Sequence, residues 1–193
     1  MKKQKNLLNC QIYAVLINFN QKYCQTTFLC VKLSLMKKSL ILITGLLHSF
    51  NKEVASLLSS KLDVYHLDIP DLIEYELADK DNIIEKCGIQ YFNKLEKNVV
   101  ASALSYENTI LSFDFETFIN YNEICTENTI SFYLCFPKEF VEDKKNMFNT
   151  INRIAYIDRD KFLRNKCEHT IVLSKKNKTT AVNEIIKKLK EMV

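Results

Sequence analysis

The chain has 193 residues, of which 47% are hydrophobic and 26% charged, a composition typical of a globular protein with a sizeable core. Its formal net charge is +4, and the lysines are scattered rather than gathered in a basic stripe, so we expect no nucleic-acid partner. The cysteines number seven without one Cys-x-x-Cys pair, which favours reduced buried thiols in a cytoplasmic protein over a disulfide framework or a zinc site.

Residues 1–35 differ from the rest of the chain. They begin with a lysine-rich stretch and turn apolar over residues 12–19, but Asn and Gln interrupt the apolar run. The run is shorter than the roughly 20 residues of a membrane span, and no cleavage site for a signal peptide follows it. Met36 precedes two lysines and resembles a second start. We expect residues 1–35 to be a poorly ordered extension or an upstream mis-start, with a membrane-surface anchor as the alternative.

From residue 36 to residue 193 strands and helices alternate. Strands are predicted at 40–44, 64–67, 109–113, 129–135 and 169–173 from short apolar runs rich in β-branched and aromatic residues. Helices are predicted at 52–61, 70–77, 80–87, 89–104, 116–124, from 137, at 151–164 and at 180–193. This alternation predicts βαβ units in one three-layer α/β/α domain with a mostly parallel five-stranded sheet.

Gly45 directly follows the first predicted strand, in the position where a phosphate-binding loop begins. Such loops follow the pattern G-x-x-x-x-G-K-[ST], in which backbone N–H groups and the lysine hold phosphates. The second glycine, lysine and hydroxyl positions hold Phe50, Asn51 and Lys52. Phenylalanine takes positive φ poorly, and a one-residue shift turns a helical side chain by about 100°. We therefore expect Lys52 to aim away from the phosphates and phosphoryl transfer to be negligible.

Three segments carry a resemblance to a known family. Residues 64–74 read VYHLDIPDLIE, similar to F-x-D-x-D-x-x-I-E, and residues 84–96 read IEKCGIQYFNKLE, similar to I-F-x-x-x-G-E-x-x-F-R-x-x-E. Residues 159–164 read RDKFLR and precede the last predicted strand, as in the pattern R-x-x-L-Y. With the loop at Gly45, these segments resemble shikimate kinases, which are small members of the P-loop kinase fold.

The resemblance implies roles for some residues and losses at others. Gly45 matches the first loop glycine, Asp68 an aspartate of the magnesium shell, Glu96 the acid that braces a substrate arginine, and Arg159 an arginine that grips the substrate carboxylate. The second aspartate of the family pattern and its substrate arginine are replaced by Pro70 and Asn93, the glycine triplet falls at residues 114–116, and the lid segment is short.

Several candidate residues also have plain structural interpretations. Asp68 is placed to cap the helix that starts near Pro70, and Asp114 to cap the helix after the third strand, although the end of a parallel strand also suits an acid or base. His48 is either a solvated loop residue or an anion contact, and His66 reads as structural.

We predict a shikimate-kinase-like protein that has lost its catalysis and binds a protein partner or a small anion, without a cofactor, as a cytoplasmic monomer. The rival hypothesis is an active kinase for shikimate or a related small molecule that uses ATP and magnesium, and a third is a decaying gene product. The candidate residues are Asp68 and Lys52 for catalysis, Asp68 for the metal, Gly45, Ser49, Asn51, Lys52 and Arg153 for the nucleotide, and Arg159, Glu96 and Asp114 for the substrate.

Overall fold

The computed structural model describes residues 40–78, 80–125, 129–137 and 153–192. Its strands are β1 (Leu40–Gly45), β2 (Tyr65–Asp68), β3 (Thr109–Ser112), β4 (Thr129–Cys135) and β5 (His169–Val172). Its helices are α3 (His48–Leu62), α4 (Ile69–Glu76), α5 (Lys80–Cys87), α6 (Ile89–Ala103), α7 (Phe115–Cys125), α9 (Arg153–Lys166) and α10 (Lys178–Glu191). The expectations for residues 1–35 and for a helix from residue 137 concern residues that are largely outside this description.

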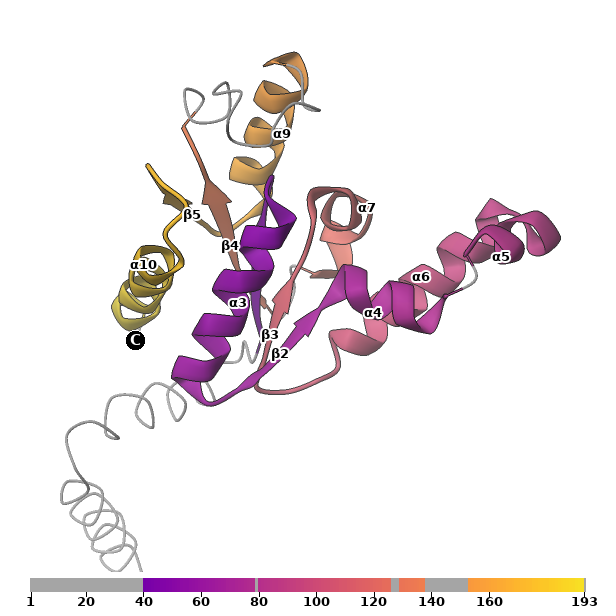
Figure 1. The fold of residues 1–193 in the computed structure, drawn as a ribbon, viewed down its shortest axis with the longest axis horizontal. Helices are drawn as coiled ribbons and strands as arrows, with labels where there is room; N and C mark the ends of the chain where they lie inside the picture. Colours follow the sequence, from indigo (N-terminus) through magenta and orange to yellow (C-terminus); the bar gives the residue numbers. More distant parts are fainter. Residues whose placement is uncertain (1–39, 79, 126–128, 138–152, 193) are drawn as a thin grey trace, which may run out of the picture.

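The strands form one sheet in the order β2-β3-β1-β4-β5 (Figure 1). Every pair of neighbouring strands is parallel, which confirms the predicted α/β class and makes the sheet wholly rather than mostly parallel. Since the central strand β1 is covered on both faces, its sequence is continuously apolar and its side chains alternate between two cores.

Helices cover both faces of the sheet and give the predicted three layers. Ile41 and Ile43 of β1 face the core formed with α3 and α10, and these two helices lie side by side on one face (Figure 1). Leu40 and Leu42 face the opposite core, which receives side chains from α4, α6, α7 and α9. Among the described helices, none has the length and apolar character needed to cross a bilayer.

The start of α3 differs from the prediction. The sequence pattern predicts a helix from 52, whereas α3 begins at His48, so only Leu46 and Leu47 separate it from β1. The N-cap residue Leu47 provides no side-chain hydrogen bond, and for this reason the usual Ser, Thr, Asp or Asn signal of a helix start is missing from the sequence. The earlier start decides the geometry of the candidate site.

Candidate functional site

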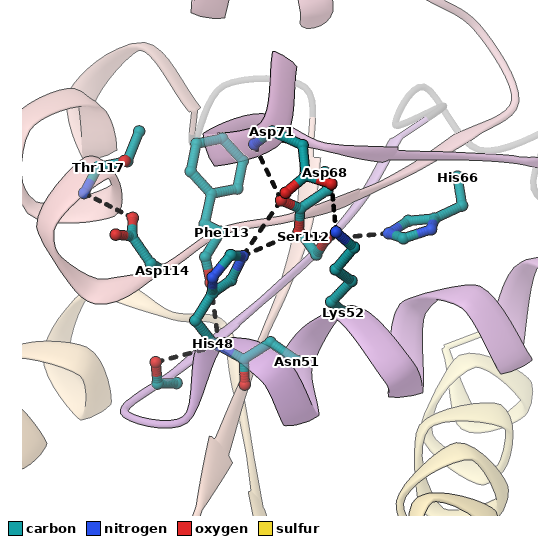
Figure 2. Close-up of polar contacts among 11 residues, drawn as sticks. His48, Asn51, Lys52, His66, Asp68, Asp71, Ser112, Phe113, Asp114 and Thr117 are labelled. Carbon is teal, nitrogen blue, oxygen red and sulfur yellow. Dashed lines mark hydrogen bonds and ion pairs between the residues drawn. The ribbon is translucent and has the colours of Figure 1, made fainter. Parts of the chain in front are cut away.

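The candidate site lies where β1, β2 and β3 end. Their carboxyl ends meet at one edge of the sheet because all the strands are parallel, and ligands of open α/β sheets bind at this edge. Asp68 at the end of β2 is in register with Ser112 at the end of β3, and Gly45 ends β1 beside them. Figure 2 shows these strand ends with the first turns of α3 and α4.

Asn51 links the end of β1 to the segment after β3 through side-chain hydrogen bonds. Its side chain is fully buried, and its Nδ2 donates hydrogen bonds to the Gly45 carbonyl at 3.0 Å and to the Phe113 carbonyl at 2.9 Å (Figure 2). A Cβ placed on Gly45 would lie 2.9 Å from Asn51 Oδ1 and 2.8 Å from the Leu134 carbonyl oxygen. The Asn51 amide therefore fills the space beside Gly45, and the loop needs a glycine there for close packing.

The other positions of the phosphate-loop pattern are divided between the core and the surface. Phe50 is buried and packs edge-to-face on Phe136, with ring centroids 5.3 Å apart. Ser49 is exposed in the first turn of α3. Arg153 begins α9, but its side chain lies outside the part of the chain that the structure describes. The position of the second pattern glycine has thus become a core position.

Asp68 is the centre of a polar network at the strand ends. Its carboxylate contacts His48 Nε2 at 3.2 and 3.0 Å, accepts the Ser112 hydroxyl at 2.5 Å and accepts the Asp71 backbone N–H at 3.1 Å (Figure 2). The last contact caps α4, as the structural interpretation of Asp68 expected. His66 Nε2 lies 2.9 Å from the Ser112 hydroxyl oxygen and extends the network along the sheet edge.

Charge and burial set the protonation of this network. The side chain of Asp68 is only 4% exposed; burial raises its pKa, but hydrogen bonds from His48, Ser112 and the Asp71 backbone outweigh this and lower the pKa to about 2. The hydrogen bond to Asp68 raises the pKa of His48. Burial lowers the pKa of His66. The contact between the two side chains therefore shifts His48 toward its protonated form and Asp68 toward its carboxylate form.

The two predicted cationic ligands that the structure describes have carboxylate partners. Lys52 points from α3 to Asp71 on α4 and forms an ion pair with it (Figure 2). Arg159 on α9 binds Glu116 on α7, with the two side-chain atoms 2.6 Å apart, and its guanidinium lies 4.5 Å from the centroid of the Phe115 ring. These two cations therefore pair with carboxylates of two different helices, α4 and α7.

The two remaining acidic candidates make contacts within the fold. Asp114 follows β3, and its Oδ1 accepts the Thr117 backbone N–H at 2.9 Å, so it caps α7 (Figure 2). Glu96 on α6 accepts a hydrogen bond from the Tyr121 hydroxyl.

A groove lies beside Lys52 at the strand ends. Besides Lys52, its lining residues are His66, Leu67, Asp68, Asp71 and Leu72. Among the described residues, no group of three or more His, Cys, Asp and Glu side chains is placed to hold a metal ion.

Sequence reasoning missed two members of the network and one contact. The sequence analysis gives no role to Ser112 and interprets His66 as structural, whereas the register pairs Ser112 with Asp68 and His66 Nε2 lies 2.9 Å from the Ser112 hydroxyl oxygen. The signal was available, because the last residues of adjacent parallel strands must meet at one edge. The link from His48 to Asp68 has no such signal, since it depends on the early start of α3.

The chain resembles known proteins in its fold, whereas the comparisons of its sequence found no match. No protein-family model matches the chain, and no curated protein is similar to it in sequence. The fold matches shikimate kinase from Aquifex aeolicus with 21% identity and a TM-score of 0.60, covering 78% of this chain and 96% of that one. It matches shikimate kinase from Acinetobacter baumannii, solved in complex with shikimate, with 20% identity and a TM-score of 0.62, covering 80% and 94%.

A third match widens the group beyond shikimate kinases. A gluconokinase from Sinorhizobium meliloti shares 12% identity and a TM-score of 0.54, covering 81% of this chain and 93% of that chain. At these identities the likeness concerns the arrangement of strands and helices. The chain has a shikimate-kinase-like fold, the α/β fold of P-loop kinases.

Proposed function

We propose that this chain is a non-catalytic relative of shikimate kinases that acts as a cytoplasmic binding protein. The observation that carries the proposal is the position of Asn51, which stands where the pattern has its phosphate-binding lysine. Its amide binds the Gly45 and Phe113 carbonyls, and so it joins two strand ends instead of facing a ligand.

The residues present do not fit a nucleotide held by a phosphate loop. Such a loop presents consecutive backbone N–H groups on a concave face, and glycines allow the close approach. Here the loop consists of Leu46 and Leu47 alone. The Asn51 N–H already donates to the Leu47 carbonyl at 2.9 Å inside the helix, and the Asn51 side chain occupies the space against Gly45.

The residues also do not fit a magnesium ion. Magnesium prefers oxygen ligands in near-ideal octahedral geometry and keeps several of its waters. Asp68 is the candidate ligand, but both of its oxygens face His48, and one of them also accepts the Ser112 hydroxyl. A cation at Asp68 would first have to displace the His48 ring and the Ser112 hydroxyl.

Charge pairing at the strand edge supports the same proposal. Lys52 and Arg159 are each bound to a carboxylate of the same chain, Asp71 and Glu116 respectively. A phosphate or carboxylate group would have to displace these partners before it gained a cation. Losing one stabilising donor commonly reduces turnover by on the order of a hundred-fold or more, so several losses together leave negligible phosphoryl transfer.

The test is isothermal titration calorimetry of the full chain with magnesium and ATP, beside the Lys52→Ala variant and the Aquifex aeolicus shikimate kinase as positive control. We expect the control to bind and this chain to release no binding heat at millimolar nucleotide. Micromolar binding that Lys52→Ala abolishes would overturn the proposal. The same samples, assayed with shikimate, would then decide whether the chain is an active kinase with a divergent nucleotide site.

A further inference from the structure

The sheet ends in two edge strands, β2 and β5. Within the described residues, each of them has a neighbouring strand on one side only, and they lie at opposite ends of the sheet (Figure 1). An edge strand presents backbone N–H and C=O groups that can pair with a further strand. Proteins use such edges to bind an extended segment of a partner, which then continues the sheet.

The backbone hydrogen bonds show which groups face outward on each edge. The Tyr65 N–H of β2 donates to the backbone carbonyl just before β3, and the Leu173 N–H directly after β5 donates to the last carbonyl of β4. Alternate residues of a strand turn their backbone groups to alternate sides. The N–H and C=O groups of His66 on β2 and of Val172 on β5 therefore point away from the sheet.

Each edge also exposes an apolar side chain, and both lie on the same face of the sheet. Tyr65 on β2 is 78% exposed and Val172 on β5 is 61% exposed. Side chains alternate between the two faces along a strand. Leu67 packs on the core that includes α4 and α9, whereas Ile171 belongs to the core with α3 and α10. Tyr65 and Val172 are thus both on the α4 and α9 side, and they would share one surface if the two edges met.

The segments that follow the two edge strands carry opposite charges. Helix α4 directly follows β2 and has three acidic side chains but no lysine or arginine. Asp71 is paired with Lys52, and Glu74 and Glu76 are exposed. The loop after β5 carries two exposed lysines at residues 175–176. Segments that follow parallel strands lie at the same end of a sheet, so parallel pairing of β5 with β2 would bring these lysines to the carboxylates.

We propose that the chain associates head to tail with further copies of itself, β5 of one copy adding in parallel to β2 of the next. The groove beside Lys52, with Leu67 and Leu72 in its lining, lies at this edge of β2. Pairing an edge strand with its own copy about a two-fold axis would be antiparallel and would separate the lysines from the carboxylates. Because the two contacting surfaces differ, the assembly grows beyond a dimer.

Sedimentation velocity of the full chain over a range of protein concentrations tests the proposal. We expect the weight-average sedimentation coefficient to rise with concentration beyond the value of a dimer. Raising the salt from about 0.05 M to about 0.5 M should weaken the association, because salt screens the charge contacts. A chain that stays monomeric throughout would overturn the proposal. A chain that stops at the dimer would also overturn it, since that result indicates two-fold pairing.

Two variants that each block one edge give a sharper test. Val172→Pro removes an outward N–H of β5 and spares the hydrogen bonds to β4. Tyr65→Lys places a charge on the β2 edge, a device that natural edge strands use against pairing. Each variant alone should be monomeric, because every copy lacks one of the two surfaces. A mixture of the two should form a heterodimer through the remaining wild-type edges. Association that persists unchanged in either variant alone would overturn the proposal.

A charge variant keeps the test valid if Val172→Pro lowers the stability of the sheet. Lys175→Glu combined with Lys176→Glu changes only the loop after β5 and should weaken the association at low salt at least about tenfold. The matched control is Lys187→Glu combined with Lys190→Glu, two exposed lysines near the end of α10. This control makes the same change of net charge away from the loop and should have a much smaller effect. Equal weakening by both variants would contradict the head-to-tail contact.

The inference goes beyond the proposed function and is independent of it. It differs from the monomer expected from the sequence. The sedimentation experiment contains no nucleotide, so a failure to associate leaves the proposed loss of nucleotide chemistry standing. Binding of magnesium–ATP in the calorimetric titration would overturn the non-catalytic function and leave the edge pairing standing.

Discussion

His48 Nε2 lies 3.0 Å from Asp68 Oδ2 and 3.2 Å from Asp68 Oδ1, so the first residue of α3 is bound to the last residue of β2. The side chain of His48 is 33% exposed and that of Asp68 is 4% exposed. The contact therefore joins a solvent-accessible imidazole to a buried carboxylate. It engages both carboxylate oxygens of Asp68 at the strand edge.

The first prediction concerns the pH dependence of stability through His48. The folded-state pKa of His48 is raised above 6.5 by its hydrogen bond to Asp68. Its contribution to stability is therefore complete below about pH 6.5 and is lost as the pH rises through the folded pKa. Urea unfolding between pH 6 and pH 9 should show this loss, with a slope of at most about 1.4 kcal/mol per pH unit for one group.

The control for this prediction is His48→Gln, which keeps a hydrogen-bond donor but does not titrate. The alkaline loss should be absent from this variant. If wild type and variant show the same slope between pH 6 and pH 9, another group causes the loss and the ion pair with Asp68 does not contribute. At low pH the loss of stability comes from Asp68. Its pKa is lowered to about 2, so its contribution to stability is lost as the pH falls from about 4 through 2.

The second prediction is that Asn51→Ala destabilises the fold by about 1–3 kcal/mol. The substitution removes both hydrogen bonds of the Asn51 amide and leaves the Gly45 and Phe113 carbonyls without that donor. Chemical denaturation measures the change. The matched control is Asn183→Ala on α10, where an exposed asparagine accepts a bond from Lys61 and the loss should stay within about 0.5 kcal/mol. Equal losses of unfolding free energy in the two variants would mean that the buried hydrogen bonds of the Asn51 amide do not stabilise the fold.

The third prediction concerns the close packing at Gly45. A methyl group there would meet the Leu134 carbonyl oxygen at 2.8 Å and Asn51 Oδ1 at 2.9 Å, so Gly45→Ala should cost about 1–3 kcal/mol. In the Asn51→Ala background one of these two atoms is gone, and the same substitution should cost less without becoming neutral. A double-mutant cycle by urea unfolding measures this coupling, and strict additivity of the two substitutions would argue against the clash.

The fourth prediction is that restoring the second pattern glycine damages the protein. Phe50→Gly removes a buried ring that packs on Phe136, and the loss should be at least about 3 kcal/mol. Tyr75→Gly on α4, where the side chain is 81% exposed, carries the helical glycine penalty of about 1 kcal/mol without the burial. Thermal unfolding compares the two variants, and losses of similar size would mean that Phe50 does not support the core.

The architecture was predictable because each strand and helix carries its own local pattern. The apolar run that became β1 is continuous, since helices cover the strand on both faces. Pro70 in the first turn of α4 and Gly88 before α6, which has a φ of 83°, marked helix ends correctly. The parallel order of the strands then followed from their alternation with helices.

The candidate site was predictable only in part, because its contacts are tertiary. The sequence identified Asp68 and its capping role, yet the His48 contact depends on α3 starting early at a residue without a capping side chain. The sequence pattern marks Asn51 as a missing lysine, whereas the structure shows it donating to the carbonyl of Gly45, which ends β1, and to that of Phe113, which directly follows β3. No local pattern encodes which carbonyls a buried amide will reach.

The central place of β1 governs how the chain can fold during synthesis. Both of its sheet neighbours, β3 and β4, come much later in the sequence, starting at Thr109 and Thr129. At about 5–20 residues per second, the ribosome makes the second neighbour several seconds after β1 has been completed, on the order of 4–20 s. Until β3 has been made, this apolar strand has no partner on either side, and until β4 follows it has a partner on one side only. The nascent chain therefore exposes this apolar strand before either of its sheet neighbours has been made, and chaperones that bind short apolar stretches meet β1 before the sheet exists.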